Sequence, residues 1–120
     1  MYNGSSFVLN LGVDQKFGPS STWTNAVFAY DTRTGVSSAD KVKIYIDGDQ
    51  ITSFSTETYP TQNYDGNWST AVQHNVGAQT GNNRQFDGYL AEFNYVDGTA
   101  LTPSTFGLTD TSTGRWIPKT

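Results

Sequence analysis

Residues 41–54 read KVKIYIDGDQITSF and predict a β-hairpin. The first seven of these residues alternate between apolar and polar side chains, so one face of a strand carries Val42, Ile44 and Ile46. The dipeptide Asp47-Gly48 favours the two-residue turn that joins antiparallel strands. Residues 50–54 supply the returning strand, and we therefore expect an antiparallel sheet with one apolar face.

Four further stretches have strand patterns. Residues 6–13 alternate between apolar and polar side chains, whereas residues 23–30 (WTNAVFAY) are apolar on both faces. The second pattern favours a central, covered strand with Trp23 in the core. Residues 72–77 form a short candidate strand. Residues 86–96 (FDGYLAEFNYV) form the longest one, with aromatic side chains on one face and an Asp-Gly pair directly after it.

The composition permits little helix. The 120 residues include only two Glu and four Lys, so the usual surface residues of amphipathic helices are scarce. One short helix is expected where Thr102 suits the N-cap, Pro103 the first helical position and Gly107 a stop. Leu, Ile, Val and Phe together make up 24 residues, which indicates a small core. The length predicts one domain, residues 1–120, in an all-β fold.

Charge and cysteine content exclude several classes of function. Seven basic residues stand against eleven acidic ones, which argues against a nucleic-acid partner. No apolar run approaches the ~20 residues that a membrane span needs, so we expect no membrane insertion. The chain contains no cysteine, which removes disulfides, thiolate metal sites and cysteine catalysis.

Several segments together carry a family resemblance. They are WTNAVFAYDT, KVKIYIDGDQITSF, HNVG, FDGYLAEFNYVDGTALTPSTFG and TDTSTGRWIP, and they span most of the chain. With them the chain resembles the concanavalin A-like lectin/glucanase superfamily, and most closely the laminin-G-like domains of bacteriophage tail-fibre and other virion proteins. The resemblance implies an antiparallel jelly-roll β-sandwich, a virion structural role with binding of host surface glycans, and a location on the phage particle, or otherwise outside the cell. The alternative is a stand-alone lectin-like domain.

The chain also departs from that pattern. A jelly roll uses about eight strands, and the sequence patterns give six. We therefore expect the opening strands of the family's domain to be missing from these residues. An incomplete sandwich leaves edge strands such as residues 6–13 bare. The expected partners are other virion subunits or a second copy of the chain, and Trp116, near the end of the sequence, is expected to pack on a sheet edge or on such a partner.

Catalysis is not expected. The glucanases of the resembled superfamily carry their carboxylates in a Glu-x-Asp-x-x-Glu arrangement, because glycoside hydrolysis needs two carboxyl groups beside the scissile bond. The two glutamates, Glu57 and Glu92, lie in no such motif. His74 is the one histidine, and no Gly-x-Ser-x-Gly turn accompanies it. A remnant of a β-glucanase is the less favoured alternative.

Carbohydrate binding asks for less than catalysis does. A sugar ring stacks on an aromatic side chain while amides and carboxylates hydrogen-bond to its hydroxyl groups. Residues 59–68 (YPTQNYDGNW) mix both kinds of residue, and a second loop adds amides. The candidate glycan ligands are Tyr59, Asn63, Tyr64, Asp65, Trp68, Asn82 and Asn83. The competing interpretation is that Tyr64 and Trp68 turn inward and cap the small core.

No cofactor or metal is expected. Calcium is the ion whose oxygen ligands the sequence best supplies, and Asp65 and Asp87 are its weak candidates. Asp87-Gly88 is equally well explained as a turn. The sequence does not identify a sugar.

Overall fold

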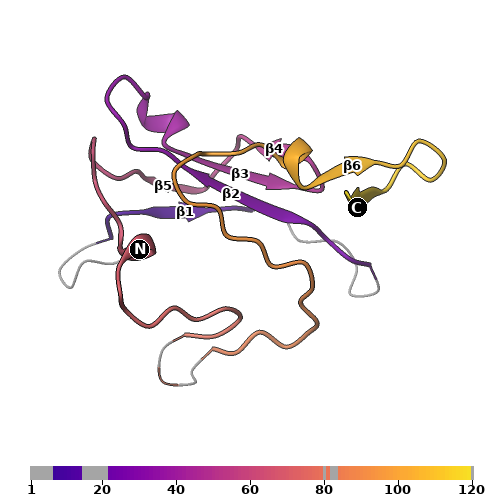
Figure 1. The fold of residues 1–120 in the computed structure, drawn as a ribbon. Coiled ribbons are helices and arrows are strands. Elements are labelled where there is room, and N and C mark those ends of the chain that lie inside the picture. Colours follow the sequence, from indigo (N-terminus) through magenta and orange to yellow (C-terminus); the bar gives the residue numbers. More distant parts are fainter. Residues whose placement is uncertain (1–6, 15–21, 80, 82–83, 120) are drawn as a thin grey trace.

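The computed structural model describes residues 7–14, 22–79, 81 and 84–119, and their path is shown in Figure 1. These residues form seven short strands and three 3-10 turns, all-β in class: β1 (Asn10–Gly12), β2 (Ala26–Tyr30), η1 (Ser38–Asp40), β3 (Val42–Ile46), β4 (Asp49–Ile51), β5 (Thr56–Thr58), η2 (Asn67–Ser69), η3 (Pro103–Thr105), β6 (Gly107–Thr109) and β7 (Trp116–Pro118). All the described strand pairs are antiparallel, so the predicted fold class is confirmed.

The predicted hairpin forms the largest sheet. Strands β3 and β4 pair with Ile46 opposite Asp49, and the turn between them is Asp47-Gly48. Both turn residues have positive φ, 49° and 91°, as the two-residue turn requires. Strand β2 pairs with the other edge of β3, which gives the order β2-β3-β4. Alternation therefore predicted the hairpin and its turn correctly.

The two faces of this sheet differ in chemistry. Residues directly opposite each other share a face, so Phe28, Ile44 and Ile51 lie on one side. The other side carries the pairs Val27–Tyr45 and Ala29–Lys43, so it combines apolar residues with a lysine. The buried apolar residues of the described chain are few: Val27, Val42 and Ile51. The core is as small as the composition indicates.

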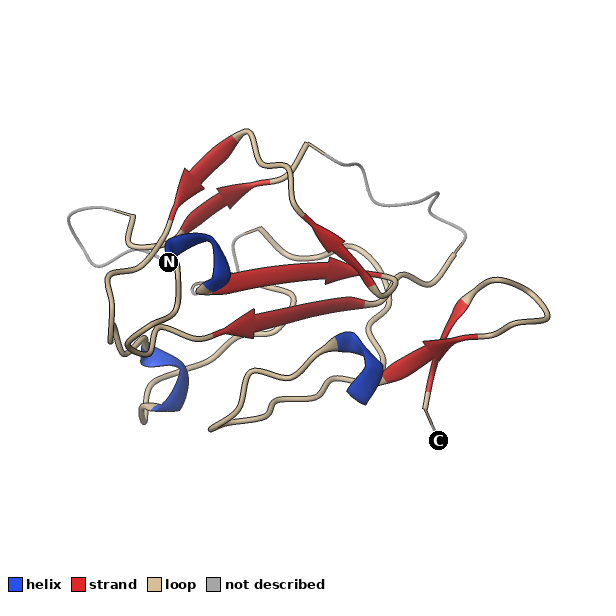
Figure 2. Cartoon of the chain, turned by 90° about the horizontal axis from the view of Figure 1, so that it is seen from above, coloured by secondary structure: helices blue, strands red, loops and turns tan. Residues whose placement is uncertain are grey.

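Two smaller sheets flank the central one. Strand β1 pairs with β5, and β6 pairs with β7. Figure 2 shows the β6–β7 pair set apart at the C-terminal end of the chain. Trp116 in β7 lies against the β3–β4 turn, because a Cβ at Gly48 would stand 2.6 Å from its Cζ3 atom. Strands β5, β6 and β7 were not predicted, since each has only three residues and no apolar alternation.

Strand β2 corrects one expectation. Residues 23–30 were expected to form a central, covered strand, but β2 begins at Ala26 and is the edge strand of its sheet. Trp23 is 66% exposed and Phe28 is 69% exposed, so neither belongs to the core. An apolar pattern on both faces shows that a strand could be covered, and the cover depends on neighbours that are not encoded in the strand itself.

The segments 72–77 and 86–96 correct a second expectation. Neither forms a strand, and every residue from 84 to 100 is exposed. Residues 87–101 make no backbone–backbone hydrogen bond to any residue that the structure describes. A strand pattern needs a neighbouring edge to pair with, and no strand of the described residues pairs with this segment.

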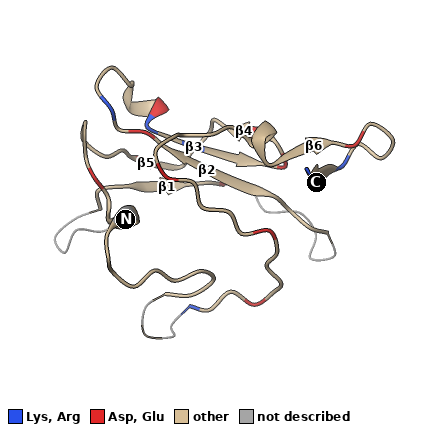
Figure 3. Cartoon of the chain, in the orientation of Figure 1, with Lys and Arg blue, Asp and Glu red and all other residues tan. Residues whose placement is uncertain are grey.

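The short helix after these segments is confirmed as a 3-10 turn. Thr102 is the N-cap of η3, Pro103 occupies its start and Phe106 is its C-cap. Within the described residues no helix has the length and apolar character to cross a membrane. Charged side chains are spread along the described chain, and Lys and Arg form no continuous group there (Figure 3).

Alanine substitutions at Gly48 and Gly35 together measure how tightly Trp116 packs on the β3–β4 turn. Both have φ of +91°, but a Cβ at Gly35 meets nothing within 4 Å. We expect Gly35→Ala to lower the free energy of unfolding by about 1 kcal/mol, the backbone cost alone. Gly48→Ala should cost about 1–3 kcal/mol more, because Trp116 must move. Chemical denaturation of both variants measures the difference, and equal losses would show that Trp116 does not pack on the turn.

Candidate functional site

Residues 59–68 form a loop that is fastened to the end of β2. The hydroxyl groups of Tyr30 and Thr32 both donate to the backbone carbonyl of Tyr64, at 3.0 Å each. The backbone N–H of Asn63 donates to the carbonyl of Thr32 at 2.6 Å. The loop is therefore held by hydrogen bonds to residues that lie more than thirty positions earlier in the chain.

A buried lysine holds the start of the same loop. Lys41 is 7% exposed, and its Nζ donates to the carbonyl of Pro60 at 2.9 Å. Pro60 is the one large side chain that is fully buried among the described residues. This contact fixes the position of the loop backbone at Pro60, a few residues before Asn63, Tyr64 and Trp68.

Trp68 packs beside Tyr30 and keeps about half of its surface in solvent. Its ring lies 6.3 Å from that of Tyr30, centroid to centroid, with 55° between the ring planes. This tilted arrangement is a favourable one for aromatic pairs. Trp68 is 48% exposed, and Tyr64 is half-buried. We name Tyr30, Tyr64 and Trp68 the aromatic platform.

Polar side chains border the platform along the loop. Asn63 and Asp65 are exposed, and the Asn63 amide donates to the Thr34 hydroxyl at 3.4 Å. Asn63 has φ of 55°, a left-handed conformation that asparagine tolerates better than most residues. The backbone thus turns at Asn63 while its amide and the Asp65 carboxylate stay in solvent beside the aromatic rings.

The structure brings together most of the predicted ligands. Asn63, Tyr64, Asp65 and Trp68 lie on the fastened loop, and Tyr59 at its start is half-buried. Asn82 and Asn83 lie outside the described residues. Tyr64 is half-buried, whereas Trp68 keeps about half of its surface in solvent, and the assignment of these residues as glycan ligands stays a prediction.

Sequence reasoning missed two residues of this site. Tyr30 was assigned only to a covered strand, and Lys41 only to the polar face of the hairpin. Both act through contacts between distant segments, at separations of 34 and 19 residues. The signal available was weak: a tyrosine at the end of a strand beside Asp31-Thr32, and a lysine at the start of the next one.

The electrostatics of the platform favour neutral phenols. Burial raises the pKa of Tyr30, and the neighbouring Tyr64 and Asp65 add to that rise, although the hydrogen bond with Thr32 opposes it. Burial also raises the pKa of Tyr59, with a further contribution from Glu57. At neutral pH both phenols are therefore protonated, and the Tyr30 proton is the one donated to the Tyr64 carbonyl.

The candidate catalytic and metal residues lie apart from the platform. Glu57 is in β5, Glu92 is in the exposed segment, and the exposed His74 contacts the carbonyl of Thr70 at 3.2 Å. Among the described residues, no three His, Asp or Glu side chains converge as the ligands of a metal ion would. Asp87 is exposed in the unpaired segment. The expected absence of a metal stays a prediction.

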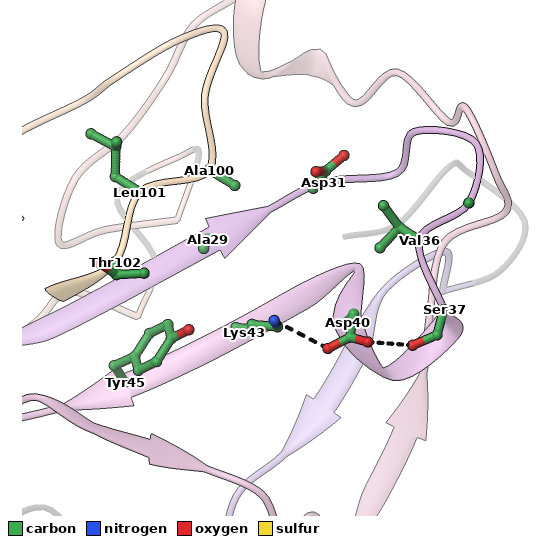
Figure 4. A pocket seen from close by; sticks show the side chains of 11 residues that line it. Ala29, Asp31, Val36, Ser37, Asp40, Lys43, Tyr45, Ala100, Leu101 and Thr102 are labelled. Atoms are coloured by element: carbon green, nitrogen blue, oxygen red, sulfur yellow. Dashed lines mark hydrogen bonds and ion pairs between the residues drawn. The ribbon is translucent and has the colours of Figure 1, made fainter.

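A pocket lies on the face of the central sheet opposite to Tyr30. Since alternate residues of a strand face opposite sides, Ala29 and Asp31 face away from Tyr30. With Lys43 and Tyr45 of β3 they line a pocket of about 400 Å³. The loop from Gly35 to Asp40 and residues 100–102 complete its walls. Figure 4 shows Ser37, Asp40 and Lys43 in a row along one side of it.

Comparison with known proteins gives one result. A laminin G family model, described as that of the concanavalin A-like lectin/glucanases superfamily, matches residues 4–105. Searches of curated proteins and of solved structures return no match. The matched range contains both the fastened loop and the walls of the pocket.

Replacing Tyr30 tests the electrostatics of the platform. A raised pKa means that the folded chain holds the Tyr30 proton more tightly than the unfolded chain does. The stability that this contributes is complete below about pH 10 and is lost as the pH rises through the folded-state pKa. In a titration followed by phenolate absorbance, we expect Tyr30→Phe to remove a late-titrating group.

Tyr89→Phe is the matched control, because Tyr89 is 88% exposed. This variant should leave the late-titrating step in place. If Tyr30→Phe instead removes a group from the main transition, Tyr30 is not enclosed by the loop.

Proposed function

Since the chain belongs to the concanavalin A-like lectin/glucanases superfamily, we propose that it is a non-enzymatic module that binds host surface glycans through the aromatic platform. The observation that carries this proposal is the position of Trp68. Its ring lies against that of Tyr30, and about half of the residue's surface is exposed to solvent. A flat aromatic surface that is held in place and open to solvent suits the C–H face of a sugar ring.

The polar groups around the platform support the same ligand class. Sugar hydroxyl groups both donate and accept hydrogen bonds. The exposed Asn63 amide supplies a donor and an acceptor, and the Asp65 carboxylate supplies acceptors. Because these groups sit on a loop fixed by Lys41, Tyr30 and Thr32, little conformational entropy is lost when a ligand binds.

We propose no glycosidase activity for the chain. Hydrolysis needs two carboxyl groups about 5–10 Å apart across the scissile bond. Asp65 is the carboxylate of the platform loop, and neither glutamate belongs to that loop. Glu57 lies in β5 opposite Leu11, and Glu92 lies in the exposed segment.

A structural role in a virion is the second candidate function, favoured by the exposed segment. Phe86, Tyr89, Leu90 and Phe93 are all more than half exposed, and residues 87–101 make no backbone–backbone hydrogen bond to the described part of the chain. At about 150–250 Å² for a whole aromatic side chain, the exposed surface of the segment sums to roughly 500–700 Å². That approaches the ~800 Å² that each partner contributes to a stable interface.

The partner for which we argue is a second copy of the chain. Two copies of the segment can pack against each other about a two-fold axis, so that the exposed apolar side chains of each copy cover those of the other. Other virion subunits are the alternative partners. This role places the protein on the phage particle, or otherwise outside the cell, and its support is the sequence resemblance of residues 86–107 together with this exposed surface.

Glycan binding is tested with Trp68→Ala on an array of bacterial surface polysaccharides. We expect the wild-type chain to bind a subset of them and Trp68→Ala to bind those at least about tenfold more weakly, because a stacking surface is lost. Trp23→Ala is the control, since Trp23 is exposed and lies outside the platform. The bound polysaccharides should be recovered uncleaved, because the proposed module is not an enzyme. If Trp68→Ala binds as strongly as Trp23→Ala does, the platform is not the glycan site.

Self-association is tested by light scattering on the purified chain. We expect a dimer or larger species at micromolar concentration, and its dissociation in the double variant Tyr89→Ser/Phe93→Ser. Leu108→Ser/Ile117→Ser is the control, because these exposed side chains lie on β6 and β7. A wild-type monomer that melts cooperatively would contradict the structural role.

A further inference from the structure

The pocket on the face opposite the platform has the volume of a small-ligand site. Its volume of about 400 Å³ lies within the usual range of roughly 300–1,000 Å³. Ala29 of β2 lies directly across from Lys43 of β3, and its small side chain leaves the space between the two strands and residues 100–102 unfilled. Both strands belong to the central sheet, so these two residues are positioned by regular structure.

The polar side of the pocket is built around one ion pair. Lys43 Nζ lies 3.1 Å from Asp40 Oδ1, and the Ser37 hydroxyl donates to Asp40 Oδ2 at 2.6 Å (Figure 4). The Ser37 hydrogen bond, followed by Lys43, lowers the pKa of Asp40, and Asp40 raises the pKa of Lys43. Both groups are therefore charged at neutral pH, and Ser37 holds the carboxylate in a fixed orientation.

The pocket carries no net charge. Asp31, the other carboxylate of the lining, forms an ion pair with Arg33 at 2.6 Å. Each carboxylate thus already has a cationic partner. An anionic sugar would meet two carboxylates, and a cation would meet Lys43, so the arrangement favours an uncharged ligand.

Apolar groups also line the pocket. They come from Ala29 and Tyr45 on the sheet and from Ala100 and Leu101 on the segment that passes beside it (Figure 4). A ligand with a C–H face and a hydroxyl edge would match the polar and the apolar groups at once. This description fits a saccharide ring better than it fits an aliphatic or an aromatic compound.

We propose that this pocket is a second saccharide site, in which the Asp40–Lys43 pair recognises two adjacent hydroxyl groups of an uncharged sugar. A donor and an acceptor 3.1 Å apart match neighbouring hydroxyl oxygens, one of which accepts from Lys43 Nζ while the other donates to Asp40. Tyr45 and Leu101 contact the C–H face. The site goes beyond the proposed function, because it lies on the other face of the sheet and does not involve Trp68.

The test is an NMR titration of the full chain with D-mannose, D-galactose and D-glucuronate. We expect the two neutral sugars to shift amide signals of the pocket residues, and glucuronate to do so at least about tenfold more weakly. Cyclohexane-1,2-diol and cyclohexane-1,4-diol form an isomeric pair that differs only in hydroxyl spacing. The 1,2-isomer should shift the same signals and the 1,4-isomer should not.

Two variants and two controls connect these shifts to the pocket. Lys43→Met removes the donor, and Ala29→Leu fills the hollow while keeping every polar group. Each should weaken binding about tenfold or more. Lys119→Met changes a lysine outside the pocket, and Ala26→Leu changes an exposed alanine of the same strand on the other face. Both controls should bind as the wild type does, and Ala29→Leu keeps the test decisive if Lys43→Met does not fold.

The outcomes separate the two saccharide sites. Shifts in the pocket that survive Trp68→Ala support the second site whether or not the platform binds glycans. Binding that is lost in Trp68→Ala and kept in both pocket variants overturns the second site and leaves the platform standing. Equal shifts from the two cyclohexanediols, or no shifts in the pocket from any of these compounds, also overturn it.

Discussion

Strand β3 is the one described strand with a hydrogen-bonded neighbour on each edge, and both candidate sites depend on it. Lys41, directly before it, holds the platform loop, and Lys43 within it lines the pocket on the other face. Because side chains alternate, a shift in register of one residue would exchange the two faces and place Lys43 among the apolar residues. The Asp47-Gly48 turn fixes that register and, with it, both sites.

Lys41 contributes more to the position of the platform loop than to the stability of the fold. Burying an ammonium group costs several kcal/mol of hydration, whereas a hydrogen bond from a charged group returns about 1.5–3 kcal/mol. No ion pair joins Lys41 to a described carboxylate, so the carbonyl of Pro60 is its main compensation. This cost is consistent with a role in which the lysine sets where the loop runs. A shorter or apolar residue would leave the Pro60 carbonyl without its donor and would remove one of the contacts that hold the loop.

The features that sequence could predict are those carried by neighbouring residues. The β3–β4 hairpin follows from alternation and a turn dipeptide, and η3 follows from Thr102-Pro103. The features that it could not predict depend on distant partners. Trp23 and residues 86–96 have apolar patterns that specify a surface for burial, but burial also needs a covering element. Tyr30 joined the site because its hydroxyl reaches a carbonyl 34 residues away, and no local pattern encodes that contact.

The smallness of the core ties the sites to the stability of the fold. Ordering each backbone residue costs about 1–2 kcal/mol, and three buried apolar side chains offset little of this cost. Hydrogen bonds between loops and sheet ends must therefore contribute more than they do in a protein with a large core. The two hydroxyl groups that hold the Tyr64 carbonyl shape the platform and also fasten the loop of residues 59–66, between β5 and η2, to the sheet. In such a molecule a binding site and a structural anchor are made of the same contacts, so an effect of mutation on binding has meaning only beside a matched change at an exposed position of the same kind.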